Sequence, residues 1–392
     1  DIVNLISDQA EFRKTPVSLS NVRLEQIENE LAGQDIPMLL NYTPGVYATE
    51  QGGGDGDVRI NIRGFDQRNV AVLIDGIPMN DMENGQVYWS NWSGLDFLTK
   101  NVQVQRGLGA SKLALPSVGG TINTITKGID AEEGGMIKQE YGSGNKFTTS
   151  FAYSTKDYKI GKFNIAASVH TSKGIVEQTP SKGLFYYLKW QKAIGNHVFS
   201  LSGFGNTQEH YQRKWKKGIN SYDKDYAASI GVADTTGEGN YGLLFNPNWG
   251  EHNNYDIIYE QGESNIDISS SIGPNIPDGT FFANGPIAVD TIQGENILTN
   301  TQKNYYHKPV FSFQHLWDIN EKSSWTNILY SSFGKGGGTS IYNSGPNYLN
   351  NDGRIDMQTI YDANSGNIAE FSNSDYDLFE QTGGNIAQYW LT

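Results

Sequence analysis

The sequence predicts a membrane all-β barrel preceded by a small α+β domain, and three observations carry this prediction. Residues 58–126 contain four short runs rich in Val, Ile and Thr, each ending near a glycine, as strands of a compact domain do. From residue 135 onward, longer segments alternate between apolar and polar side chains. No apolar run approaches the ~18 residues that a membrane-spanning helix needs. The first pattern indicates the N-terminal domain, and the other two favour a β-barrel over a helical membrane protein.

The composition excludes several classes of function. The 392 residues include no Cys, 22 Tyr and 8 Trp, and carry a net charge of −14. Excess negative charge argues against nucleic acid as a partner, and the lack of cysteine removes thiolate catalysis and Cys-ligated zinc. The aromatic content fits the girdles of a membrane barrel and equally a secreted β protein that binds glycans. Segments of about ten residues favour the barrel, because soluble sandwich strands are typically ~5–6 residues long.

The N-terminal part is expected to divide into a tail, residues 1–14, and a domain, residues 15–130. Residues 17–19 suggest a short strand and residues 22–27 a short helix that follows a possible N-cap. A second helix is expected from Asp35, with Pro37 in its first turn, where the missing N–H costs nothing. The predicted strands of a small mixed sheet are residues 58–62, 70–74, 102–105 and 121–126.

Residues 131–392 are expected to form the first part of the barrel. The alternation is clearest in residues 146–156 and 162–172, which are separated by a short turn at Asp157. Residues 209–304 and 334–384 lack clear strands and are expected as long extracellular loops, since outer-membrane barrels have short turns on one side and long loops on the other. This pattern amounts to about seven strands and a broken eighth, so we expect a fragment of a larger barrel.

Five motifs, in order, resemble the plug domain of TonB-dependent outer-membrane receptors. They are LLNYTPGV (39–46), IRGF (62–65), LIDGIPM (73–79), VQVQRGLGASKL (102–113) and VGGTINTITK (118–127). The resemblance implies a barrel of about 22 antiparallel strands, closed by this plug, of which about 7–8 strands are present here. It places the protein in the outer membrane of a Gram-negative bacterium, surrounded by outer-membrane lipid.

The same resemblance implies active import of a scarce ligand, driven by the TonB energy-transducing complex, with no enzymatic activity and no cofactor. Siderophores, haem, glycans and peptides are all open as ligands. The long loops also resemble those of importers that work with a surface lipoprotein lid. The alternative function is a receptor-like structural or assembly component of an outer-membrane complex, with other subunits and without transport of its own.

The motifs also supply candidate plug positions. The resemblance implies that Arg63 and Arg106 pair with carboxylates of the barrel wall and hold the plug in place. The full set of structural motif positions is Arg63, Gly64, Asp75, Gly76, Arg106, Gly107, Gly119 and Gly120.

Two loop segments are candidates for ligand contact. Residues 80–92 combine carboxylates with aromatic rings. Their aromatic rings could pack on the sheet or face a ligand in the vestibule, and their two carboxylates could perform acid–base chemistry. The ligand-facing candidates there are Asn80, Asp81, Glu83, Tyr88, Trp89 and Trp92. The basic segment 210–217 either attracts anions or is a solvated loop, and its candidates are Arg213, Trp215 and Lys216.

No metal site is expected. The six histidines lack an i, i+4 partner. Residues 350–356 resemble a calcium loop, but Thr359 stands where its twelfth-position Glu would be.

Overall fold

The computed structural model describes residues 18–31, 33–51, 58–107, 117–214, 217–234, 239–261, 286–321, 323–341, 349–350, 352–358, 360 and 390–391. The chain forms two compact units. The first comprises residues 1–248, 300–341 and 390–392, and the second comprises residues 249–299 and 342–389. The expected N-terminal tail, residues 1–14, lies outside the described residues.

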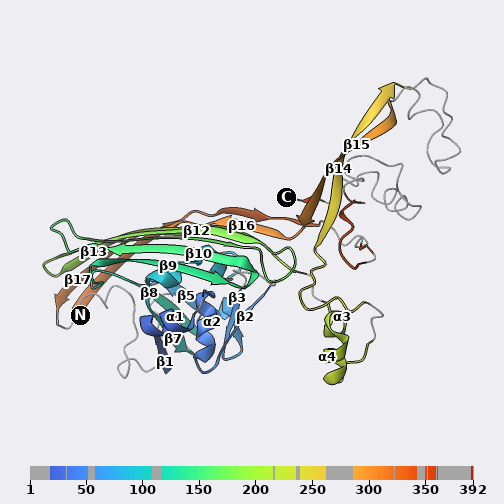
Figure 1. Cartoon of the computed structure of the whole chain (residues 1–392). Coiled ribbons are helices and arrows are strands. Elements are labelled where there is room, and N and C mark those ends of the chain that lie inside the picture. The colour runs from blue at the N-terminus through green and yellow to red at the C-terminus, as the bar shows by residue number, and fades with distance from the viewer. Residues whose placement is uncertain are drawn as a thin grey trace. The chain divides into compact units, whose positions relative to one another are not determined.

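The N-terminal domain contains a five-stranded mixed sheet in the order β1-β7-β8-β5-β6 (Figure 1). β5 and β8 run parallel, and the other neighbouring pairs are antiparallel. The strands are β1 (Ser18–Arg23), β5 (Val70–Ile74), β6 (Ile77–Pro78), β7 (Thr99–Arg106) and β8 (Gly120–Thr126). The small mixed sheet expected from the Val/Ile/Thr runs is therefore present.

A second sheet and short helices complete the domain. The sheet contains β2 (Val46–Glu50), β3 (Val58–Ile62) and β4 (Phe65–Asp66). α2 (Ile36–Leu39) follows Asp35 with Pro37 in its first turn, as expected. α1 (Leu24–Glu30) begins two residues later than expected, because Val22 and Arg23 pair with β7. The 3-10 turns are η2 (Leu40–Tyr42), η3 (Gln67–Asn69), η4 (Trp89–Trp92) and η5 (Leu95–Leu98).

The remainder of the first unit is a large antiparallel sheet, which covers the N-terminal domain in Figure 1. Its main path runs β18-β17-β13-β12-β11-β10-β9, and β16 pairs with β13 and β19. The strands are β9 (Gly134–Gly142), β10 (Lys146–Ser154), β11 (Lys162–Ser172), β12 (Ser181–Ile194), β13 (His197–Tyr211), β16 (Lys303–His307), β17 (Val310–Asn320), β18 (Ser323–Ser332) and β19 (Lys335–Gly338), and the turn η6 (Ser143–Asn145) joins β9 to β10. The strand expected over residues 305–317 is interrupted at Pro309, which has no N–H to donate.

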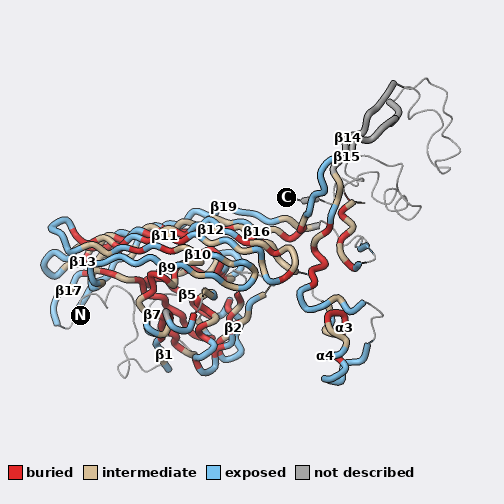
Figure 2. The backbone as a smooth tube through the Cα atoms, viewed as in Figure 1, coloured by how far each residue is buried: buried red, intermediate tan, exposed pale blue. Residues whose placement is uncertain are grey.

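Side chains of this sheet alternate between its two faces as the sequence pattern indicates. On β10, Phe147, Phe151 and Tyr153 are exposed, whereas Ser150 and Ala152 are buried. The buried face of the sheet joins the core of the N-terminal domain, as the burial colours in Figure 2 show. On β10 the apolar face therefore points outward and the small face points toward the domain, whereas β12 and β13 also direct Phe185 and Phe204 inward.

The two expected long loops contain more regular structure than the sequence pattern indicates. Within residues 209–304 lie α3 (Ile219–Tyr222), α4 (Lys224–Ser229), β14 (Trp249–Gln261) and β15 (Pro286–Asn300), and within residues 334–384 lie β19 and β20 (Ser340–Ile341). The expectation of segments without clear strands was therefore wrong. Strand pairing uses backbone groups, so these strands pair without the strict alternation that a half-buried strand shows.

The expected strand near residue 384 is described only as β21 (Trp390–Leu391), which pairs with β20. In the second unit, β14 and β15 form a two-stranded sheet. Asn253 N donates a 2.8 Å hydrogen bond to Gln358 Oε1, and the Arg354 guanidinium lies 4.8 Å from the centroid of the Trp249 ring.

Candidate functional site

The candidate site is the contact between the N-terminal domain and the inward face of the large sheet. Its centre is Asp75, which follows the fully buried strand β5. Asp75 and Gly76 form a two-residue turn to β6, and both have positive φ, 49° and 78°. Asp and Gly tolerate this left-handed conformation, so the turn places a carboxylate at the end of a buried strand.

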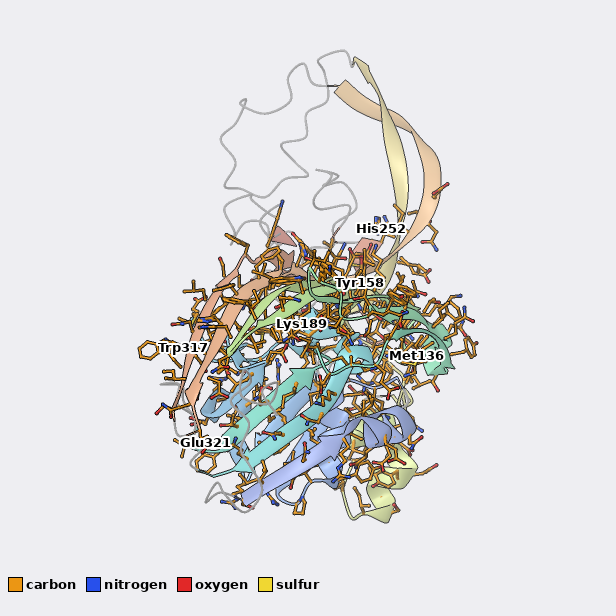
Figure 3. The ribbon with its side chains drawn as sticks, turned by 90° about the vertical axis from the view of Figure 1, so that its left-hand side faces the viewer. Met136, Tyr158, Lys189, His252, Trp317 and Glu321 are labelled. Atoms are coloured by element: carbon orange, nitrogen blue, oxygen red, sulfur yellow. The ribbon has the colours of Figure 1, made fainter. Side chains whose placement is uncertain are left out.

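The Asp75 carboxylate is buried and accepts three hydrogen bonds. Its Oδ1 accepts a 2.9 Å hydrogen bond from Thr126 N on β8. Its Oδ2 accepts from Thr126 Oγ1 at 2.6 Å and from Lys189 Nζ at 2.9 Å. Lys189 belongs to β12 of the large sheet and is labelled in Figure 3. The exposed fractions of the two side chains are 9% for Asp75 and 7% for Lys189, so the ion pair is shielded from water.

Further hydrogen bonds surround this ion pair. Lys189 Nζ also donates to Thr126 Oγ1 at 3.0 Å, and Tyr187 OH lies 2.7 Å from the same hydroxyl. Because Thr126 gives its proton to Asp75, Tyr187 is the donor to Thr126. Gln314 Nε2 on β17 donates to the backbone oxygen of Asp75 at 2.9 Å. Asp75 thus contacts two strands of the large sheet that are separated by β13.

Other contacts between the domain and the sheet are apolar packing of Phe185 and Phe204 in the shared core, hydrogen bonds, and close backbone approaches. Asn206 Nδ2 donates to Ser90 O at 2.7 Å, and Lys146 Nζ donates to Gly33 O at 2.7 Å. Gly94 has φ of 98°, and a methyl group added there would lie 3.1 Å from Ser168 Cβ. The domain therefore approaches the sheet most closely where a side chain is absent.

The two arginines of the motif set lie next to other segments of the N-terminal domain. Arg63 and Gly64 form a turn between β3 and β4 with φ of 52° and 81°. Arg106 Nη1 donates to Pro44 O at 2.9 Å. Among the described residues, no carboxylate pairs with Arg63 or Arg106, so their role at the barrel wall stays a prediction.

The remaining motif glycines stand at close approaches. A methyl group added at Gly107, where φ is 93°, would lie 2.8 Å from Arg63 Nη1. At Gly120 it would lie 2.2 Å from Gln105 O, and at Gly119 it would lie 2.7 Å from Phe65 Cβ. These positions require glycine for packing within the domain.

The loop of residues 80–92 is largely held by its own contacts. The Asn80 side chain accepts from Val72 N, and Asp81 Oδ1 accepts from the backbone N–H groups of Glu83 and Asn84. Trp89 and Trp92 are buried in the core, which corresponds to the packing alternative for these rings.

Two side chains of this loop remain accessible. Glu83 is exposed, and Tyr88, 38% exposed, accepts a 3.0 Å hydrogen bond from Asn84 Nδ2. Contact with a ligand stays a prediction for them.

Arg213 is fixed within its loop. Its Nη1 donates to Leu243 O at 2.7 Å and to Phe245 O at 2.9 Å, and its guanidinium lies 5.1 Å from the centroid of the Tyr222 ring. Trp215 and Lys216 lie outside the described residues. These contacts give Arg213 a structural role in the loop, and ligand contact by this segment stays a prediction.

A second group of charged residues lies near β9. Burial raises the pKa of Asp96 in η5 to about 6, while Lys138 lowers this pKa and Glu140 and Asp35 raise it. Lys138 Nζ and Glu140 Oε1 are 2.8 Å apart. Asp96 is therefore a carboxylate that titrates well above the ordinary range of an aspartate.

Lys189, Tyr187, Thr126 and Gln314 were not among the predicted site residues. The sequence does contain a signal for Lys189, because it is a lone cation on the polar, inward face of an alternating strand. Its partner on the plug could not be inferred, since nothing in the strand pattern pairs β12 with the turn at Asp75.

The described residues include no cluster of three or more metal-ligating side chains. In the same part of the chain, no helix is both long and apolar enough to cross a membrane.

Sequence comparisons identify relatives of this chain. A family model described as TonB-dependent Receptor Plug Domain matches residues 11–121. The vitamin B12 transporter BtuB of Vibrio vulnificus is 23% identical over 223 residues, which cover 56% of this chain and 36% of that protein. The probable TonB-dependent siderophore receptor PirA of Acinetobacter baumannii is 28% identical over 137 residues, covering 32% of this chain and 18% of that protein. In both alignments, the chain spans well under half the length of the relative.

Solved structures show the same fold. The open form of the ferric-catecholate import receptor Fiu from E. coli K12 has a TM-score of 0.53 at 15% identity, covering 85% of this chain and 41% of that one. The unliganded ferric citrate transporter FecA has a TM-score of 0.51 at 16% identity, covering 84% and 41%. These likenesses confirm the predicted fold class, a plug domain with strands of a β-barrel. The N-terminal domain matches the TonB-dependent receptor plug family, and the chain has the fold of that plug domain together with part of a β-barrel.

Proposed function

We propose that the full-length protein imports a scarce ligand across the outer membrane of a Gram-negative bacterium, with energy from the TonB complex. The observation that carries this proposal is the polar contact between plug and wall. The plug core extends to Phe185, Tyr187 and Phe204 of the sheet, and beside these residues the buried Asp75 network joins plug and sheet through polar groups.

The ligand class follows from the relatives only in outline. Relatives are named as a vitamin B12 transporter and as siderophore receptors, so a compact chelate is a natural first candidate. Haem, glycans and peptides are the other candidate ligands. The exposed side chains of Glu83 and Tyr88 suit polar ligands with planar parts. The protein performs no chemistry on the ligand in this proposal.

The partners follow from the same mechanism. The TonB complex supplies the pulling force, and outer-membrane lipid surrounds the apolar outer face of the sheet. A surface lipoprotein lid or other outer-membrane subunits are compatible with the folded loop that contains α3 and α4.

The test is binding of the detergent-purified full-length protein to the periplasmic domain of TonB, with and without each candidate ligand. We expect binding that one ligand strengthens, together with energy-dependent uptake of that ligand by cells. Absence of binding under every condition by a folded, plug-containing barrel would contradict import and favour the structural or assembly component.

A matched pair of variants locates the ligand contact. Tyr88→Ala is expected to weaken ligand binding, whereas Tyr42→Ala, at a plug tyrosine that is 71% exposed outside this loop, should leave it unchanged. Equal effects of the two substitutions would remove the loop of residues 80–92 from the proposed site.

A further inference from the structure

The Asp75–Lys189 ion pair differs from the other ion pairs of the described residues. In each of the others, at least one side chain is more than one-fifth exposed, whereas both partners of this pair are less than one-tenth exposed. It also joins two separately built parts of the molecule, the plug turn after β5 and the wall strand β12. A buried ion pair at such a boundary couples the position of the plug to the solvation of two charges.

The network around the pair depends on the plug remaining in place. If the plug moves away, Lys189 loses both the Asp75 carboxylate and the Thr126 hydroxyl, and Gln314 loses the backbone oxygen of Asp75. Separation leaves a buried charge on each side until water enters the gap. The contact therefore resists small displacements and becomes weak once the gap is hydrated.

We propose that the Asp75–Lys189 pair is the latch that holds the plug against the barrel wall, and that its rupture controls when the plug moves. This assignment rests on the proposed import function, in which plug movement opens the path. It gives Asp75 and Lys189 a positioning role rather than contact with the ligand. The motif arginines, Arg63 and Arg106, have no such carboxylate partner within the described part of the chain.

A cysteine placed under the plug provides a direct reporter of plug position. Ser168 on β11 is 4% exposed and lies under Gly94 of the plug. These 392 residues contain no cysteine. Once any cysteine elsewhere in the full-length protein is replaced, Ser168→Cys supplies a single thiol that reacts with a water-soluble maleimide only when the plug leaves this part of the wall. Labelling is measured on the full-length protein in detergent, without ligand and without TonB.

The variants compare removal of one charge with removal of both. Lys189→Met keeps most of the aliphatic length but leaves Asp75 without its cation, so we expect labelling to accelerate by about a hundredfold. Asp75→Asn, which tolerates the left-handed turn, should also accelerate labelling. The double variant Asp75→Asn/Lys189→Met leaves no unpaired charge and is expected to return the rate to within about tenfold of the parent.

Lys182→Met is the matched control. Lys182 lies on the same strand, and its side chain is 66% exposed and pairs with Glu209, so its loss should leave labelling unchanged. Heat-modifiable gel mobility identifies folded barrels, and Asp75→Asn provides the comparison if Lys189→Met fails to assemble. Equal labelling of folded single variants, the parent and the control would overturn the latch.

Failure of the latch and failure of import can be told apart. The labelling comparison uses neither ligand nor TonB, so it tests the latch alone. Lack of TonB binding by the parent protein would contradict the proposed function, whatever the labelling rates are.

Discussion

The plug and the barrel wall differ in where their apolar side chains lie. In the plug, every residue of β5 is buried, and Val58, Ile60 and Ile62 of β3 have no exposed surface. In the wall, most buried residues are small or polar, with Phe185 and Phe204 among the exceptions, whereas Phe151 on β10 and Leu201 on β13 point outward and are nearly half exposed. The plug therefore contains its own hydrophobic core, while the wall places its apolar side chains where membrane lipid would cover them.

This contrast explains why the contact between the two parts is largely polar. The inward face of the wall adds Phe185, Tyr187 and Phe204 to the plug core, and most of its other buried side chains are polar. Hydrogen bonds and one buried ion pair position the plug beside this apolar patch, and such contacts exchange with water at little net cost when both partners are hydrated. We therefore expect the plug to keep most of its own core when its contacts with the wall are broken.

The largest expected effect comes from a cavity in the plug core. Ile60→Ala removes buried methyl groups from a site without exposed surface and should lower plug stability by about 2–5 kcal/mol. Leu201→Ala on the outer face of the wall is the control and should change plug stability by less than about 0.5 kcal/mol. The stability of the plug in both variants is measured by the urea-induced exposure of a thiol at Val104→Cys, in the plug core. Equal loss of plug stability in Ile60→Ala and Leu201→Ala would contradict the difference between plug and wall.

The converse change targets the outer face of the wall. Phe151→Lys places a charge on the exposed face of β10 and should cost about 2–4 kcal/mol if that position lies near the bilayer midplane. Phe151→Leu keeps the face apolar and should be tolerated. Equilibrium unfolding of the barrel in lipid vesicles tests this, and a lysine variant as stable as the leucine variant would argue against lipid contact at β10.

The close approach at Gly94 should show a smaller effect. Gly94→Ala adds a methyl group 3.0 Å from Phe185 Cβ on the wall and also strains a backbone with φ of 98°, at a cost of about 1–3 kcal/mol. Gly64→Ala has similar backbone strain, with φ of 81°, but open space around the new methyl group. If Gly94→Ala increases Ser168→Cys labelling more than Gly64→Ala does, the extra effect comes from the clash with the wall. Identical increases in the two variants would show that the clash has no effect on labelling.

The smallest effect is a pH dependence at Asp96. Because the pKa of Asp96 is raised to about 6, the folded state binds this proton more tightly than the unfolded state, so this residue's contribution to stability falls as pH rises from about 4 to about 6. Asp96→Asn should therefore raise Tm relative to the parent at pH 7.5 and match it near pH 4. A pH-independent difference between the two proteins would show that ionisation of Asp96 is not the cause.

Local pattern was enough to predict much of the fold. The alternation of Phe147, Phe151 and Tyr153 with small residues predicted β10 and its outward face, and Asp35 with Pro37 predicted the start of α2. β14 and β15 were missed, because their sequences lack that strict alternation. The break at Pro309 follows from its missing N–H and was readable from the sequence, although a continuous strand was expected there.

The site was less predictable than the fold. Asp75 was identified from its motif, but its partner Lys189 lies 114 positions away in the sequence, and only the tertiary structure brings them together. Trp89 and Trp92 illustrate the same limit, since tryptophan rings suit both a ligand site and a core. Which of the two they occupy depends on the tertiary structure around them. Pairing across domains depends on geometry that no local pattern contains.

The central claim is that the plug is a self-supporting folded body held to the wall mainly by polar contacts. Urea titration of the full-length Val104→Cys protein in detergent tests it most directly, with thiol reactivity reporting the plug and heat-modifiable gel mobility reporting the barrel. The account predicts two transitions, with the plug thiol reacting while the barrel is still folded. A single transition, in which plug and barrel unfold together, would contradict it.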